Sequence, residues 1–187
     1  MRACLVLAAI LSGAIAWIYP TKYVQGWCVF GLFPLGAGLL AVLVWPVLKP
    51  AWGLLRTEYP HITQSVLILC ALIVAAVVCM GWLLGLSSPG AVMALATTLC
   101  FFLAAVLCMV KWGAAVTLAL SIILTIFSAT IGGDVLADSA LWILAMPAWP
   151  EIATSAARFP IALVLSIAMS AAAWIGASTL LPKLLTR

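Results

Sequence analysis

Long apolar runs separated by short polar connections dominate the pattern of this chain. An α-helix needs roughly 20 apolar residues to cross the hydrocarbon core of a bilayer. The run lengths therefore predict an all-α integral membrane protein, with residues 1–187 forming a single polytopic domain as a compact bundle of about six transmembrane helices. The expected spans are residues 3–19, 26–47, 65–86, 89–110, 113–131 and 159–181.

The connections between these runs are short. The sequence Ser87-Ser88-Pro89-Gly90 is typical of a tight turn, and 111–113 of a hinge, so that the flanking helices are expected to lie antiparallel. The first run also resembles a signal peptide, because Arg2 precedes an apolar stretch and an A-x-A sequence follows at 14–16. We expect this segment to be a first span or a signal anchor.

Composition supports a membrane location. Charged residues make up 6% of the chain and hydrophobic residues 68%, which leaves too little polar surface for a water-soluble domain. The net charge of +4 comes from scattered residues with no basic cluster, so nucleic acid is not an expected partner. Membrane lipids are expected partners.

The distribution of basic residues predicts an orientation. If the N-terminus and the C-terminus are both cytoplasmic, six of the eight basic residues lie on the cytoplasmic side, as the positive-inside rule requires. These six are Arg2, Lys49, Arg56, Lys111, Lys183 and Arg187, while Lys22 and Arg158 lie on the opposite side. We expect a bacterial inner membrane.

Candidate chemistry is sparse. The six cysteines lie in apolar runs without a CxxC pair, and His61 is the single histidine, so neither a metal nor a cofactor is expected. No nucleotide-binding or hydrolase motif occurs, and no catalytic residue is predicted. The spans also lack an internal charge, which disfavours ion coupling by this chain alone.

The second span carries a proline among glycines: Gly31, Pro34, Gly36 and Gly38. A proline removes a backbone donor and kinks a helix. Broken helices often line substrate sites in membranes, because the freed carbonyl groups can coordinate a ligand. The alternative is a kink that serves helix packing only.

Two rows of hydroxyl side chains recur at helical spacing in the last two spans. They are Thr117, Ser121, Thr125 and Ser128 in the fifth span, and Ser166 and Ser170 in the sixth. Beside the second row runs a ridge of small residues at 168, 172 and 176. Such faces can form a polar path for a substrate, or can pack helices against each other or against a partner subunit.

The connection 132–158 is the longest outer loop. Asp138 is expected to cap a short helix over 139–146, which is too apolar for water and too short to span, so it is interfacial or re-entrant. Asp134 and Asp138 are spaced to bind a divalent cation, or to form a solvated face and a cap. Trp142, Trp149 and Glu151 complete an expected partner-binding surface.

The connection 48–64 holds Lys49, Trp52, Arg56 and His61. Its spacing predicts a short helix on the membrane surface, where the basic side chains contact anionic head groups. A role in binding a partner is also expected here.

Three functions are compatible with the sequence. The first is a non-enzymatic subunit of a multi-protein transport or secretion/conjugation-type assembly, acting through helix packing with other membrane subunits or with copies of itself. The second is a small permease for a neutral or lipid-like substrate, using the Pro34 break and the hydroxyl rows. The third is a membrane-embedded lipid-modifying enzyme, in which His61 and the acids of the 132–158 loop would transfer protons.

Overall fold

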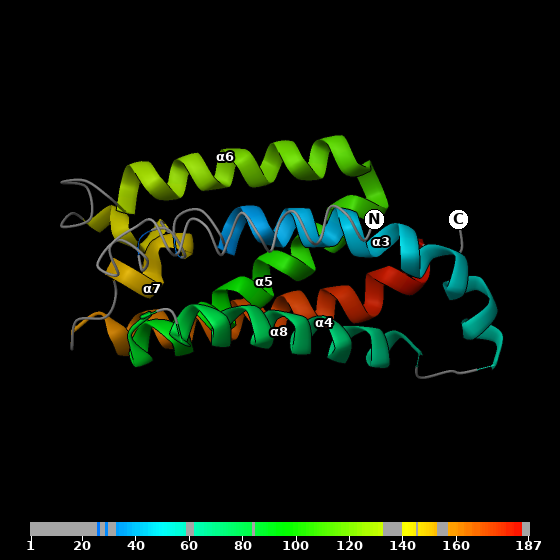
Figure 1. Ribbon diagram of the computed structural model, residues 1–187, viewed down its shortest axis with the longest axis horizontal. Helices are drawn as coiled ribbons and strands as arrows, with labels where there is room; N and C mark the ends of the chain where they lie inside the picture. The colour runs from blue at the N-terminus through cyan, green and yellow to red at the C-terminus, as the bar shows by residue number, and fades with distance from the viewer. Residues whose placement is uncertain are drawn as a thin grey trace.

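The computed structural model describes residues 26, 29, 33–58, 62–83, 85–132, 140–144, 146–152 and 157–184. Every secondary-structure element in this part of the chain is a helix, which confirms the all-α class (Figure 1). In chain order they are α3 (Phe33–Glu58), α4 (Ile62–Leu83), α5 (Ser88–Trp112), α6 (Ala114–Gly132), the 3₁₀ helices η3 (Ala140–Leu144) and η4 (Met146–Ala148), α7 (Trp149–Ile152) and α8 (Phe159–Leu184). The expected first span, 3–19, lies outside the described residues.

The described helices have the dimensions of a helical membrane protein. Three are long and apolar enough to cross a membrane: Thr63–Leu83 in α4, Ser88–Trp112 in α5 and Phe159–Lys183 in α8. Shorter apolar helices are Phe33–Pro46 in α3 and Ala114–Thr130 in α6. Large apolar side chains are exposed along α4, α6 and α8, a surface that suits lipid contact and not water.

The start of α5 is fixed by local chemistry. The Ser87 side chain accepts a hydrogen bond from the backbone N–H of Gly90, with an N···O distance of 3.2 Å, and so caps the helix. Pro89 lies in the first turn, where its missing N–H costs no helical hydrogen bond. Ser88, Pro89 and Gly90 are therefore helical, and the chain reverses just before them, at Gly85 (φ 114°).

A single glycine separates α5 from α6. Gly113 has a φ of 87°, which favours glycine, and its N–H donates to the carbonyl oxygen of Met109 over 3.1 Å. The Thr117 N–H then donates to Gly113 O over 3.2 Å, which begins the first turn of α6. The expected hinge at 111–113 is therefore one residue long.

Helix α5 lies at the centre of the bundle and contacts α3, α4, α6 and α8 (Figure 1). The Ser170 hydroxyl donates to Ala96 O over 2.6 Å, and the Ser166 oxygen lies 3.9 Å from the sulfur of Met93. Because both residue numbers rise together along this contact, α5 and α8 run in the same direction.

Trp45 lies at the end of the bundle where α5 and α8 finish. It lines a small cavity together with Val66, Val106 and Leu181, which belong to α4, α5 and α8. The late part of α3 therefore meets the start of α4 and the ends of α5 and α8. It follows that α3, α5 and α8 run one way, and that α4 runs the other way.

Helix α3 continues well beyond the expected end of its span at residue 47. It reaches Glu58 and passes through Pro46 and Pro50. A proline removes one helical hydrogen bond and bends a helix, but neighbouring groups can satisfy the freed carbonyl, so the helix need not end there. The separate short helix expected on 48–64 is thus the end of α3.

Buried apolar side chains form two clusters in the described residues. The larger joins α3, α4, α5 and α8 around Phe102 and Leu103, both fully buried. The smaller lies where Met93 and Ala162 meet Trp142 and Trp149, under the segment formed by η3, η4 and α7. We call these three elements, η3, η4 and α7, the cap.

Candidate functional site

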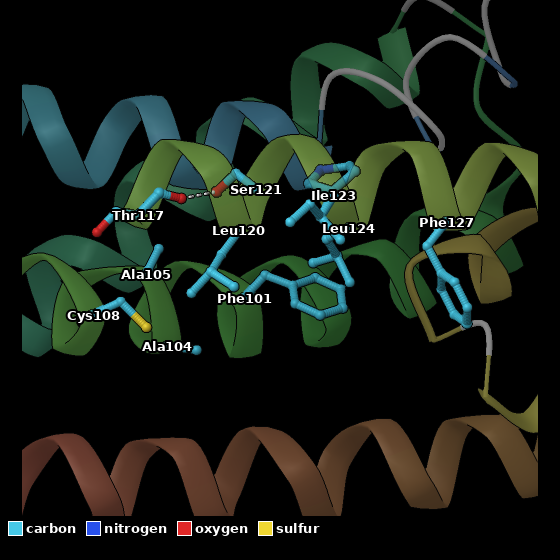
Figure 2. A pocket seen from close by; sticks show the side chains of 11 residues that line it. Phe101, Ala104, Ala105, Cys108, Thr117, Leu120, Ser121, Ile123, Leu124 and Phe127 are labelled. Carbon is cyan, nitrogen blue, oxygen red and sulfur yellow. Dashed lines mark hydrogen bonds between the residues drawn. The ribbon is translucent and has the colours of Figure 1, made fainter. Parts of the chain in front are cut away.

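A groove of about 310 Å³ runs between α5 and α6 (Figure 2). Cys108 and Thr117 lie at one end and Phe127 at the other, and the side chains of Leu120 and Phe101 occupy the space between the two helices (Figure 2). Its lining is almost entirely apolar and contains no charged residue: Pro34, Phe101, Ala104, Ala105, Cys108, Thr117, Leu120, Ser121, Ile123, Leu124 and Phe127.

The groove follows from the spacing of residues on the two helices. On α5 the lining positions 101, 104, 105 and 108 repeat at three and four residues, so they share one face. Small side chains at Ala104 and Ala105 leave room there. On α6 the bulkier lining residues are partly outside the bundle, because Leu120 is 45% exposed and Ile123 62% exposed. The groove is thus open along one side, toward the outside of the bundle.

The hydroxyl groups of α6 do not make this groove polar. Thr117 donates to Gly113 O over 2.9 Å, Ser121 to Thr117 O over 3.0 Å, and Thr125 to Ser121 O over 2.7 Å. Each hydroxyl proton is therefore engaged with the backbone one turn earlier on the same helix. Thr117 and Ser121 are also buried. The row predicted as a possible substrate path thus carries hydroxyl groups whose protons are bonded within α6.

The back of the groove is closed where α3 crosses α6. A Cβ atom added at Gly38 would overlap the hydroxyl oxygen of Ser121 and lie 2.6 Å from Ser121 Cβ. Glycine at 38 therefore serves close helix packing. Gly36 has no such neighbour, since a Cβ added there meets nothing within 4 Å. Pro34 is helical in the first described turn of α3 and lines the groove, whereas Gly31 lies outside the described residues.

Two further hydroxyl groups lie just beyond the Phe127 end of the groove. Thr98 is one helical turn before Phe101 on α5, and Ser128 follows Phe127 on α6. Both side chains are buried, and neither hydroxyl oxygen has a hydrogen-bond partner among the described residues. An unpartnered hydroxyl in an apolar interior is unfavourable, so each of these two groups carries a desolvation cost.

A lysine, Lys111, lies just beyond the Cys108 end of the groove. Lys111 follows Ala104 by seven positions and Cys108 by three, so it continues the lining face of α5 for one more turn. Its ammonium nitrogen lies 4.7 Å from the ring centre of Trp112, and both side chains are exposed. Lysine and tryptophan together are typical of the boundary between hydrocarbon and head groups.

The hydroxyl row of α8 faces a different partner. Ser170 bonds to α5, as described above, and the Ser166 hydroxyl donates to Leu163 O over 2.9 Å. These residues are buried in the α5–α8 contact and do not line the groove. The ridge of small residues beside them is not buried in the described structure, because Ala168 and Ala172 are exposed.

The cap covers the ends of α5 and α6 that lie away from Lys111. The indole N–H of Trp149 donates to Trp142 O over 3.0 Å, and their rings meet edge to face at 6.3 Å. Both rings are buried, so they stabilise the cap and offer little surface to a partner. The carbonyl oxygen of Pro150 would lie 2.8 Å from a Cβ at Gly90, which shows how closely the cap approaches α5.

The charged residues near the cap do not form a catalytic cluster in the described structure. Burial raises the pKa of the Glu151 carboxyl above its ordinary value near 4.5. Arg158 lies over the ring of Trp142 at 5.5 Å. Asp134 and Asp138 lie outside the described residues, as does His61. Within the described ranges, no group of three or more histidine, cysteine or acidic residues could hold a metal ion.

The remaining predicted contact residues lie on α3. Lys49 is exposed, while Trp52 and Arg56 belong to the end of the helix, where side chains are outside the described part. Sequence reasoning missed most of the groove, including Phe101 and Leu120, because an apolar residue that lines a groove looks like one that faces lipid. No known protein family, characterised protein or solved structure matches this chain.

Proposed function

We propose that this protein is a non-enzymatic membrane protein that binds a neutral or lipid-like molecule in the α5–α6 groove, and that it acts as a small permease for that molecule. The observation that carries this proposal is the apolar groove of about 310 Å³, open on one side between two helices and free of charged lining residues. Ligand sites are concave and mostly apolar, with few polar groups.

The bonding of the α6 hydroxyls supports an apolar ligand over a hydrated one. A path for an ion or a sugar needs donors and acceptors that replace water, whereas Thr117 and Ser121 use their protons within their own helix. The open side also gives an apolar chain a route from the bilayer that does not cross water.

Photolabelling in vesicles tests this proposal. The protein would be reconstituted in phosphatidylcholine containing a phosphatidylcholine with a diazirine-bearing acyl chain, and the labelled peptides identified by mass spectrometry. We expect labelling to concentrate on the peptides of α5 and α6, and to be largely lost in Leu120→Trp, which fills the groove. Ile126→Trp is the matched control, because Ile126 is exposed on α6 and does not line the groove.

Transport is measured with the same pair of variants. Movement of a fluorescent phosphatidylcholine between leaflets should slow in Leu120→Trp and remain unchanged in Ile126→Trp. Labelling that is spread evenly over the exposed faces of α4, α6 and α8, and is insensitive to Leu120→Trp, would overturn the proposal.

A second candidate is a subunit of a transport or secretion/conjugation-type assembly in a bacterial inner membrane. The observation that favours it is the exposed small ridge on α8, with Ala168, Ala172 and the half-buried Gly176 at four-residue intervals. Small residues let helices approach closely in membranes. Here Ala172→Trp should weaken association with a partner or a second copy, while Ile167→Trp, at an exposed α8 position outside this row, should not.

Three lysines at one end of the bundle support an orientation of the protein in the membrane. Lys49 follows Trp45 by one turn, Lys111 follows Val106 by five residues, and Lys183 follows Leu181 by two, so the three lysines lie at the end marked by Trp45. By the positive-inside rule this end is cytoplasmic. Accessibility of a cysteine introduced at Lys49 to a membrane-impermeant reagent, in spheroplasts against inverted vesicles, tests the assignment.

A further inference from the structure

We infer that the α5–α6 groove and the Lys111–Trp112 pair together form a site for one anionic phospholipid, with an acyl chain in the groove and the phosphate at Lys111. This inference rests on the proposed function, since it names the class of lipid that the groove takes. It is carried by the alignment of the apolar groove with Lys111, which lies one helical turn beyond the Cys108 end of the groove.

The alignment follows from helix geometry. Ala104, Cys108 and Lys111 are four and three residues apart, and therefore lie on one face of α5 in successive turns. A lipid chain that lies between Phe101 and Cys108 thus leaves the groove beside Lys111. The opposite end, near Phe127, is lined by aromatic and aliphatic side chains and has no cation among its lining residues.

The Lys111 end has the chemistry of a head-group contact. The ammonium group lies over the exposed Trp112 ring at 4.7 Å, which holds it at the membrane boundary. A lysine near the membrane surface attracts an anionic lipid. Helix α6 starts at Ala114, just after this pair, and carries no acidic residue in its first turn. The backbone N–H groups of that turn and the positive end of the α6 dipole also favour an anion.

The size of the groove supports a single chain. A volume of about 310 Å³ is at the lower end of the range for ligand pockets, roughly 300–1,000 Å³. We therefore assign one acyl chain to the groove, and leave the second chain of the lipid among the exposed side chains of α6 outside it, such as Val116.

The experiment compares two lipids of the same acyl chains. The full-length protein, purified in detergent and depleted of lipid, would be titrated with phosphatidylglycerol and with phosphatidylcholine, and bound lipid counted by native mass spectrometry. One lysine at the membrane surface predicts about a fivefold preference for phosphatidylglycerol. The preference should disappear in Lys111→Gln, which should bind the two lipids about equally, and it should be retained in Lys111→Arg.

Matched variants separate this inference from the proposed function. Lys183→Gln removes an exposed lysine of α8 at the same end of the bundle and should keep the preference. Leu120→Trp should weaken binding of both lipids. Equal binding of the two lipids by the wild-type protein, or an equal loss of preference in Lys183→Gln and Lys111→Gln, would overturn the inference and leave the proposed function standing. Binding that is insensitive to Leu120→Trp would instead overturn the proposed function.

Discussion

Helices α6 and α8 carry the same sequence signal and use it differently. Each has a row of hydroxyl residues at intervals of about one turn. On α8 the Ser170 hydroxyl lies 2.6 Å from Ala96 O on the neighbouring α5, and 2.8 Å from Ser166 O on its own helix. On α6 the Ser121 hydroxyl bonds to Thr117 O on its own helix. The α8 row therefore ties two helices together, and the α6 row does not.

The difference explains where the groove forms. Helix α8 packs along α5 through a narrow buried stripe that includes Ala162, Ser166 and Ser170. Helix α6 is held by α3 at the Gly38–Ser121 crossing, and its apolar side chains face α5 across the groove. Because α6 makes its close contact with α3, it can leave a gap on the side that faces α5.

The largest expected effect comes from closing the Gly38 crossing. Gly38→Ala places a methyl group against Ser121 Cβ, which cannot move aside by rotation, and overpacking of this kind costs about 1–3 kcal/mol. We expect a corresponding drop in the free energy of unfolding, measured by thermal or denaturant unfolding in detergent.

A double-mutant cycle sharpens this prediction. Ser121→Gly removes the atoms that the new methyl group would meet, so Gly38→Ala combined with Ser121→Gly should be more stable than the sum of the single changes indicates. Gly36→Ala is the control, since a Cβ there has open space, and should have little effect. Additive single changes would show that α6 is not held at this crossing.

The next effect concerns the hydrogen bond between α5 and α8. Ser170→Ala removes it, and such bonds within membranes contribute about 0.6 kcal/mol on average and up to about 1.7 kcal/mol. Ser121→Ala removes only a bond within α6 and should cost less. Unfolding measured in parallel on the two variants checks the comparison, and an equal cost would mean that the two hydroxyl rows are equivalent.

These two rows also show what the sequence can predict. Spacing placed the hydroxyl residues of each helix on one face, because residues three and four apart share a face whatever that face contacts. Spacing could not identify the acceptor of each hydroxyl, since a serine or threonine in a helix can bond to its own backbone or to another helix with similar geometry. The choice depends on how close the neighbouring helix lies.

Other features were hidden for related reasons. The end of α3 was expected at residue 47, but a proline only bends a membrane helix whose freed groups find other partners, so Pro46 and Pro50 do not end it. The groove-lining residues Phe101 and Leu120 could not be distinguished from lipid-facing ones by composition. Only the placement of α6 relative to α5 reveals them.

A smaller gain in stability is expected at Thr98, just beyond the groove. Its hydroxyl is buried and has no partner among the described residues, so it retains a desolvation penalty that a methyl group would not have. Thr98→Val should raise the free energy of unfolding by up to about 1 kcal/mol. The neighbouring Thr97 is the control, because its hydroxyl donates to Met93 O over 3.1 Å and Thr97→Val should bring no gain. A loss of stability in Thr98→Val would indicate a polar partner for this hydroxyl.

The smallest effect is a pH dependence at the cap, which covers the ends of α5 and α6 on the side away from Lys111. Burial raises the pKa of Glu151 in the folded protein, so the folded state binds a proton at a pH where the unfolded chain has released it. The stability that this proton adds is present at low pH and is lost as the pH rises through the folded-state pKa. We therefore expect wild-type unfolding temperatures to rise more than those of Glu151→Gln when the pH is lowered from neutrality. Since the other titrating groups are common to both proteins, identical pH profiles would mean that the cap does not bury this carboxyl.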